Sequence, residues 1–208
     1  MELQYYGGNC IRINTKEASI VVDDNLEALG LKPITKGDDI VLRTTYDDKQ
    51  DKQEVLTIAQ PGEYEVSKVA IQGIPARAHM DEEGKQTATI FKLTTSEMRI
   101  AVVGHIHPDL GEAELEAMGT VDLLVIPVGG GGYTLDATGA LQVIKKIEPK
   151  VIVPVHYADS KIKYEVPQAE LADVLKNLSM EVHETVPKLK LKASDLPEAT
   201  QLIVVERQ

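Results

Sequence analysis

Short apolar runs alternate with polar turns through the first hundred residues. The segments 10–14, 19–24 and 68–74 read CIRIN, SIVVDD and KVAIQGI. Each is rich in β-branched residues and is bounded by Gly, Asn, Lys or Glu, a pattern typical of β-strands. Pro61-Gly62 indicates a turn. The first half is therefore predicted to be mainly strand.

From about residue 110 the apolar pattern changes period. Residues 121–129 and 151–157 read VDLLVIPVG and VIVPVHY, continuous apolar runs that predict strands covered on both faces. Between them, residues 136–150 place Ala140, Val143, Ile144 and Ile147 on one helical face. Further helices are predicted over 111–119 and 167–179. Strands followed by alternating helices and strands predict one layered α/β domain over residues 1–208.

Composition and charge limit the classes of partner that the protein is expected to bind. The chain has 208 residues, 43% of them hydrophobic, and a formal net charge of −11. An acidic chain is a poor partner for nucleic-acid backbones or anionic membranes, so neither is expected. The single cysteine, Cys10, cannot form an internal disulfide, and the first residues, MELQYYGGN, lack a signal-peptide pattern. We therefore expect a cytoplasmic protein.

Three stretches together resemble the metallo-β-lactamase superfamily. They are QPGEYEVSKVAIQGIPARAH (60–79), RIAVVGH (99–105) and VDLLVIPVGGGGYTLDATGALQVIKKIEPKVIVPVHY (121–157). The chain is most similar to small bacterial members related to the ascorbate-phosphate lactonase type. The resemblance implies a four-layer αββα sandwich with a metal site at the ends of its two sheets.

The first metal-binding motif of that family, H-x-H-x-D-H, is lost in this sequence. The resemblance places Thr45, Asp47, Lys49 and Gln50 where its ligands should lie, and residues 38–52 (DDIVLRTTYDDKQDK) contain no histidine. The family's bridging aspartate falls on His105, and a neutral imidazole offers one lone pair to one metal. A two-zinc centre is therefore not expected.

The other histidines leave two interpretations open. His79 and His156 fall on the family's remaining metal positions, so the resemblance implies one divalent ion, most simply zinc, held by His79, His105 and His156, or none at all. The alternative for each is a structural histidine bonded to the backbone. His107 forms an H-x-H pair with His105, and His183 is expected to be exposed.

Two further features complete the candidate site. In the glycine run 129–132, Gly130 and Gly131 either contact a bound ligand, with Tyr133 as a pocket wall, or form a tight turn before a helix. Asp23 and Asp24 are expected to cap the turn that follows them. Asp47 or Asp48 would serve as the general base if the protein hydrolyses an ester.

Function is left between two classes. In the first, the chain is a non-catalytic relative of the two-zinc hydrolases that binds an unidentified small molecule in a depleted site. In the second, it is a single-metal hydrolase of a phosphoester, lactone or similar ester. A purely assembly role, as a homo-oligomer, is a weaker third alternative.

Overall fold

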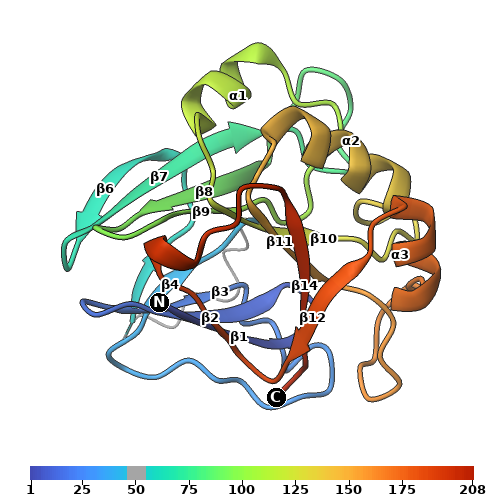
Figure 1. Ribbon diagram of the computed structural model, residues 1–208, viewed down its shortest axis with the longest axis horizontal. Helices are drawn as coiled ribbons and strands as arrows, with labels where there is room; N and C mark the ends of the chain where they lie inside the picture. Colours follow the sequence, from blue (N-terminus) through green and yellow to red (C-terminus); the bar gives the residue numbers. More distant parts are fainter. Residues whose placement is uncertain (46–54) are drawn as a thin grey trace.

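The computed structural model describes residues 1–45 and 55–208, and its strands form two sheets packed face to face (Figure 1). Within these ranges the smaller sheet has six strands. In spatial order they are β13 (Leu189–Lys190), β1 (Glu2–Gly7), β2 (Cys10–Asn14), β3 (Ser19–Val22), β4 (Ile40–Leu42) and β5 (Leu56–Ile58). Neighbours from β13 to β3 are antiparallel, whereas β3, β4 and β5 run parallel.

The larger sheet has eight strands in the described chain. In spatial order they are β12 (Val182–Val186), β14 (Gln201–Val205), β11 (Val151–Val155), β10 (Leu123–Pro127), β9 (Arg99–Val102), β8 (Ala88–Thr94), β7 (Val69–Ala76) and β6 (Gly62–Val66). The strands from β12 to β9 are parallel, and those from β9 to β6 are antiparallel. All five residues of both β10 and β11 are buried, as their continuous apolar runs predict.

In the part of the chain that the structure describes, three α-helices lie over the outer face of the larger sheet (Figure 1). They are α1 (Glu112–Met118), α2 (Ala137–Ile147) and α3 (Leu171–Leu178), and a 3₁₀ turn follows at Ala193–Asp195. The predicted face of α2 is buried: Ala140, Val143, Ile144 and Ile147 all pack against the sheet. In the described chain, no helix is long and apolar enough to cross a membrane.

The outer face of the smaller sheet is covered by turns. In the described ranges, Cys10 and Val21 of that sheet pack beneath Leu26, Leu29 and Ile162, none of which lies in a helix. The expected α/β architecture of two packed sheets is confirmed, and in the described ranges the outer layer over the smaller sheet is a covering segment of turns around Leu26 and Leu29. One domain for the whole chain remains a prediction.

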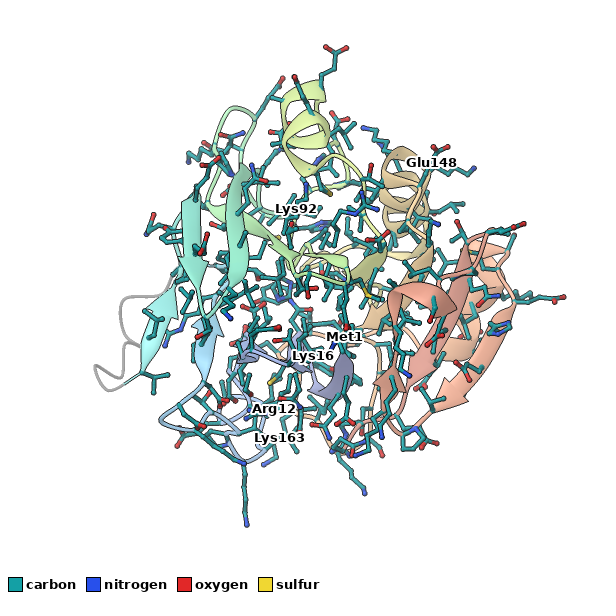
Figure 2. The ribbon with its side chains drawn as sticks, turned by 60° about the vertical axis from the view of Figure 1, so that its left-hand side comes forward. Met1, Arg12, Lys16, Lys92, Glu148 and Lys163 are labelled. Atoms are coloured by element: carbon teal, nitrogen blue, oxygen red, sulfur yellow. The ribbon has the colours of Figure 1, made fainter. Side chains whose placement is uncertain are left out.

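One buried ion pair and two more exposed ones hold the periphery of the sheets. Arg12 of β2 forms a bidentate pair with Asp39 at 2.5 and 3.0 Å and also donates to the carbonyl of Ile34, which fixes the covering segment; Figure 2 shows Arg12 beside it. Glu97 of the larger sheet's β8–β9 turn pairs with the amino group of Met1 and with Lys16, both labelled in Figure 2. The contacts of Glu97 join the two sheets at the end where β9 begins.

Two strands, β6 and β12, lie outside the segments expected as strands. Residues 62–66 were expected only as part of a turn region, yet they form β6, which pairs with β7 through a two-residue turn at Ser67 and Lys68. Both turn residues have positive φ, 49° and 62°, as a type I′ hairpin requires. Neither is Gly or Asn, the residues that usually signal such a turn, and so this hairpin has no recognisable sequence signal.

Candidate functional site

The candidate site lies where parallel strands of both sheets end. His105 follows β9, the loop that carries Tyr133 follows β10, and His156 follows β11 directly. From the smaller sheet, Asp23 follows β3 and Thr44 follows β4. Carboxyl ends of parallel strands share one edge of a sheet, where ligand sites of α/β proteins form. The fold therefore collects these side chains from both sheets.

His105 and His156 are in direct contact. Their ring centroids are 4.8 Å apart with an interplanar angle of 84°, an edge-to-face arrangement. The ring of Tyr133 lies 4.6 Å from that of His105. His156 is 4% exposed, so the pair forms the floor of the site and Tyr133 its outer part.

The position of His156 is fixed by the fold. Its backbone is left-handed, with φ of 55°, and its amide donates to the hydroxyl of Tyr5 at 3.2 Å. Its Nδ1 lies 3.1 Å from Oε1 of Gln168, whose own Nε2 donates to the carbonyl of Val166. Because that oxygen can only accept, Nδ1 carries the proton and donates to it. Burial lowers the pKa of His156, against the opposing effect of the Gln168 hydrogen bond.

His79 reaches the same region through the backbone. Its amide donates to the carbonyl of His105 at 2.8 Å, and the amide of His107 donates to the carbonyl of Arg77. The rings of His79 and His107 lie 6.3 Å apart, centroid to centroid. Nδ1 of His107 accepts from the amide of Asp109, whereas Nδ1 of His79 and of His105 are buried and have no partner in the described chain.

Burial and the neighbouring histidines keep the imidazole of His105 neutral. Burial lowers the pKa of His105 to about 3, and the neighbouring His156 and His79 lower it further. A neutral imidazole could offer a lone pair to a metal. However, among the residues that the structure describes, no three His, Cys, Asp or Glu side chains form a group that could hold a metal ion. The pair His105–His156 is thus brought together, and the three-histidine ligand set remains a prediction.

Asp23 and Asp24 brace the loops around the site and do not cap the turn as expected. The carboxylate of Asp23 accepts from the amide of Thr44 at 2.8 Å and from its hydroxyl at 2.6 Å. Burial raises the pKa of Asp23 to about 6, although the Thr44 hydrogen bonds act in the opposite direction. Oδ2 of Asp24 accepts from the amides of Ile34 and Thr35 and from the Thr35 hydroxyl.

The glycine run has the geometry of a tight turn. The amide of Gly130 donates to the carbonyl of Leu135, and the Asp136 side chain caps α2 by accepting from Gly139. A Cβ on Gly129 would overlap the carbonyl oxygen of His156, so that glycine allows two strand-end loops to approach closely. This is the turn interpretation of the run. Contact of Gly130 and Gly131 with a ligand remains a prediction.

A cavity of about 160 Å³ opens beside the histidine pair. Its lining is polar and comes from three loops of the smaller sheet and two of the larger: Asn9, Asp23, Asp24, Asn25, Arg43, Thr44, Thr45, His105 and Tyr133. Sequence reasoning missed Asn9 and Asn25. Asn9 stands in a Gly-Gly-Asn turn and Asn25 follows a strand, where Asn is common for turn geometry alone, so neither carried a recognisable signal.

The predicted general bases lie outside the described residues. Thr45 lines the cavity, and Asp47, Asp48, Lys49 and Gln50 come after the last described residue of that loop. The sequence itself limits what this loop can supply, because the five histidines of the chain are His79, His105, His107, His156 and His183. Of these, His183 is exposed on β12, as expected.

Comparisons with known proteins agree with this architecture. A family model described as the beta-lactamase superfamily domain matches residues 2–156. A UPF0173 metal-dependent hydrolase from Thermoplasma acidophilum is 38% identical over 47 residues, which is 21% of this chain and 20% of that protein. The match thus spans only about a fifth of that relative's length.

Solved structures match along the whole chain. A proposed Zn-dependent hydrolase of the metallo-β-lactamase superfamily from Thermotoga maritima superposes with a TM-score of 0.77 and 24% identity, over 100% of this chain and 99% of that one. Igni18, a metallo hydrolase from Ignicoccus hospitalis, gives 0.63 and 17% over 99% and 94%. At these identities the structures show the fold alone. From the family match over residues 2–156, the chain belongs to the β-lactamase superfamily, and its fold is the metallo-β-lactamase fold.

Proposed function

We propose that this protein is a metallo-β-lactamase-fold member with a depleted metal site, which binds a small molecule at the strand ends and does not hydrolyse it. One observation carries the proposal. His105, which the resemblance aligns with the family's bridging aspartate, packs edge-on against His156, and the described residues contain no group of three ligands for a metal.

The chemistry of the superfamily explains why this matters. A bound zinc ion supplies the Lewis acid and lowers the pKa of a bound water to about 7. A pair of metals needs a bridging carboxylate and several imidazoles, whereas the resemblance aligns Thr45, Asp47, Lys49 and Gln50 with the first motif. Lys49 would add a positive charge next to a cation. These substitutions favour binding without metal-assisted water attack.

A single-metal hydrolase is the second candidate, and one observation favours it. Nδ1 of His79 and Nδ1 of His105 are buried and lack partners in the described chain, as two metal-binding nitrogens would be without their ion. His79, His105 and His156 would hold the ion, and Asp47 or Asp48 would act as general base. The names of the relatives, which refer to zinc-dependent and metal-dependent hydrolases, point the same way.

Elemental analysis of protein purified without chelator separates the two candidates. We expect zinc, manganese and iron well below one equivalent, and no change in unfolding temperature when these ions are added. The matched variants are His156→Asn, in the site, and His183→Asn, exposed on β12. Stoichiometric metal that is lost in His156→Asn and retained in His183→Asn would contradict the depleted site and establish the single-metal alternative.

A further inference from the structure

The loop between β11 and α3 folds back on the strand end that it leaves. The amide of Ala158 donates to the carbonyl of Ala169 at 2.9 Å, and the amide of Ala169 donates to the carbonyl of Gly129 at 2.8 Å. These two hydrogen bonds close the loop at its base. Gln168 is therefore returned to the side of His156, although 12 positions separate the two residues in the chain.

Two glycines of the run after β10 make room for Gln168. A Cβ on Gly129 would overlap Oε1 of Gln168. A Cβ on Gly131 would lie 2.7 Å from the carbonyl oxygen of Pro167 and 3.2 Å from Nε2 of the Gln168 amide. The amide of Gln168 thus lies in a space that a side chain at either glycine would occupy.

The same loop also holds the ring of His156. The ring centroid of Tyr164 lies 5.0 Å from that of His156, and the Tyr164 hydroxyl donates to the carbonyl of Tyr157 at 3.0 Å. On the other side, the amide of His156 donates to the hydroxyl of Tyr5. Both the backbone and the ring of His156 are therefore held in place, so that Gln168 meets an imidazole of fixed orientation.

A backbone carbonyl fixes the hydrogen atoms of this contact. The carbonyl of Val166 can only accept, so the NH₂ of Gln168, 3.0 Å away, faces it. Oε1 of Gln168 then faces Nδ1 of His156 at 3.1 Å and requires a proton on that nitrogen. Turning the amide round would place its oxygen against the Val166 carbonyl, where two acceptors repel each other. A neutral His156 therefore has its lone pair on Nε2.

We propose that Gln168 is a positioning residue of the site, which holds the neutral imidazole of His156 as the Nδ1–H tautomer and keeps the Nε2 lone pair free for a ligand. In water the Nε2–H tautomer is the commoner form of a neutral histidine side chain. A ligand that reaches this ring must therefore offer a hydrogen-bond donor, whereas without Gln168 the ring would offer a donor itself. This inference rests on the proposed function, because it names the hydrogen-bonding group that the same site requires of its ligand.

Nitrogen-15 NMR of protein with labelled histidine tests the tautomer. The protein is treated with chelator, so that no bound ion fixes the ring, and is measured at pH 8, where His156 is neutral because burial lowers its pKa. The signals that disappear in His156→Asn identify this ring. We expect a protonated Nδ1 and an unprotonated Nε2 in wild type. A wild-type ring that is protonated on Nε2 overturns the proposal.

Variants separate positioning from packing. Gln168→Met removes the acceptor at a similar side-chain length, and the Nδ1–H form should fall from nearly the whole population to a minority. Gln168→Glu retains an acceptor and should keep the proton on Nδ1. Gln142→Met, exposed on α2, is the matched control and should behave as wild type.

Folding of each variant is verified by thermal unfolding. Gln168 is only half-buried, so its replacement should leave the fold intact, and Gln168→Ala takes the place of Gln168→Met if that variant does not fold. A tautomer that is unchanged when the acceptor is removed overturns the proposal, as does a change of tautomer in Gln142→Met of the same size as in Gln168→Met.

Metal analysis before the chelator step keeps the two hypotheses separate. An Nε2–H ring in metal-free wild type overturns the role of Gln168 and leaves the depleted site intact. Stoichiometric metal overturns the depleted site, whereas the tautomers of wild type and Gln168→Met in the stripped protein still decide the role of Gln168.

Discussion

Asp23 shows how one residue couples the site to the stability of the fold. It ends β3, it has positive φ, and both of its carboxylate oxygens accept hydrogen bonds from Thr44 at the end of β4. These bonds favour the charged form, and burial outweighs them. Asp23 therefore joins the ends of β3 and β4, and its buried carboxyl group is harder to ionise than one in water.

Stability should fall as pH rises through the range in which Asp23 ionises. Its pKa is raised in the folded protein from 3.8 to about 6, so the native state binds more protons than the unfolded chain between these values. The stabilisation is complete below pH 3.8 and is lost by about pH 6. Relative to Asp23→Asn, wild type should lose about 2 kcal/mol across this range.

Urea unfolding of both proteins at pH 4, 5, 6 and 7 measures this difference. Asn at position 23 retains an acceptor for the Thr44 amide, so the brace is kept. Asp38→Asn, at an exposed position, is the control, and its difference from wild type should not follow this profile. A wild-type minus Asp23→Asn difference that is constant with pH would contradict the prediction.

Site residues were predictable from the sequence only where a strand carried them. His105 and His156 end apolar runs, so the pattern and the family resemblance pointed to one sheet edge. Asn9 and Asn25 were missed because their role depends on contact between the β1–β2 turn and the loop after β3, a tertiary relation that has no local sequence signature.

At the scale of elements, the segments that follow β9 and β4 approach each other closely at Gly104, which faces Thr44. Gly104 follows β9 with φ of 60°, and a Cβ there would overlap the side chain of Thr44. Moving Thr44 would break its hydrogen bonds to Asp23. The two sheets therefore meet at the site with no space for a methyl group.

Gly104→Ala should destabilise the protein more than Gly132→Ala. Both positions have positive φ, 60° and 72°, so both variants carry a backbone cost of about 1 kcal/mol. A Cβ at Gly132 meets nothing within 4 Å, whereas at Gly104 the clash should bring the total loss above about 2 kcal/mol. Urea unfolding measures both. Equal losses would show that φ, and not the contact with Thr44, requires Gly104.

Strand prediction succeeded where burial is complete and failed where it is partial. The fully apolar runs before Gly129 and His156 became β10 and β11, because a strand covered on both faces has no polar side. β6 is an edge strand with Glu63 and Glu65 exposed, and its pairing depends on a turn without glycine. Its sequence therefore resembles a loop.

At the scale of the whole molecule, both sheets share one core. Residues from β1 to β5 and from β7 to β14 meet between the sheets, among them Tyr5, Phe91 and Val153. Neither sheet can lose this interface without exposing apolar surface of the other. The two sheets should therefore unfold together.

We expect one cooperative unfolding transition. Far-UV circular dichroism reports the strands and helices, and tyrosine fluorescence reports the core through Tyr5, since the chain has no Trp. The two signals should give the same urea midpoint and slope. Separate midpoints would show that residues 1–208 do not behave as the single domain that the sequence predicts.

The left-handed backbone of His156 offers a structural reason for a histidine at this position. Histidine, with Asn and Asp, is over-represented among the non-glycine residues that adopt this conformation. Replacement by an aliphatic residue would strain the main chain whatever the imidazole does. Selection for this backbone conformation can therefore retain histidine at position 156 even after a catalytic role is lost. The presence of His156 is therefore weak evidence that the protein catalyses a reaction.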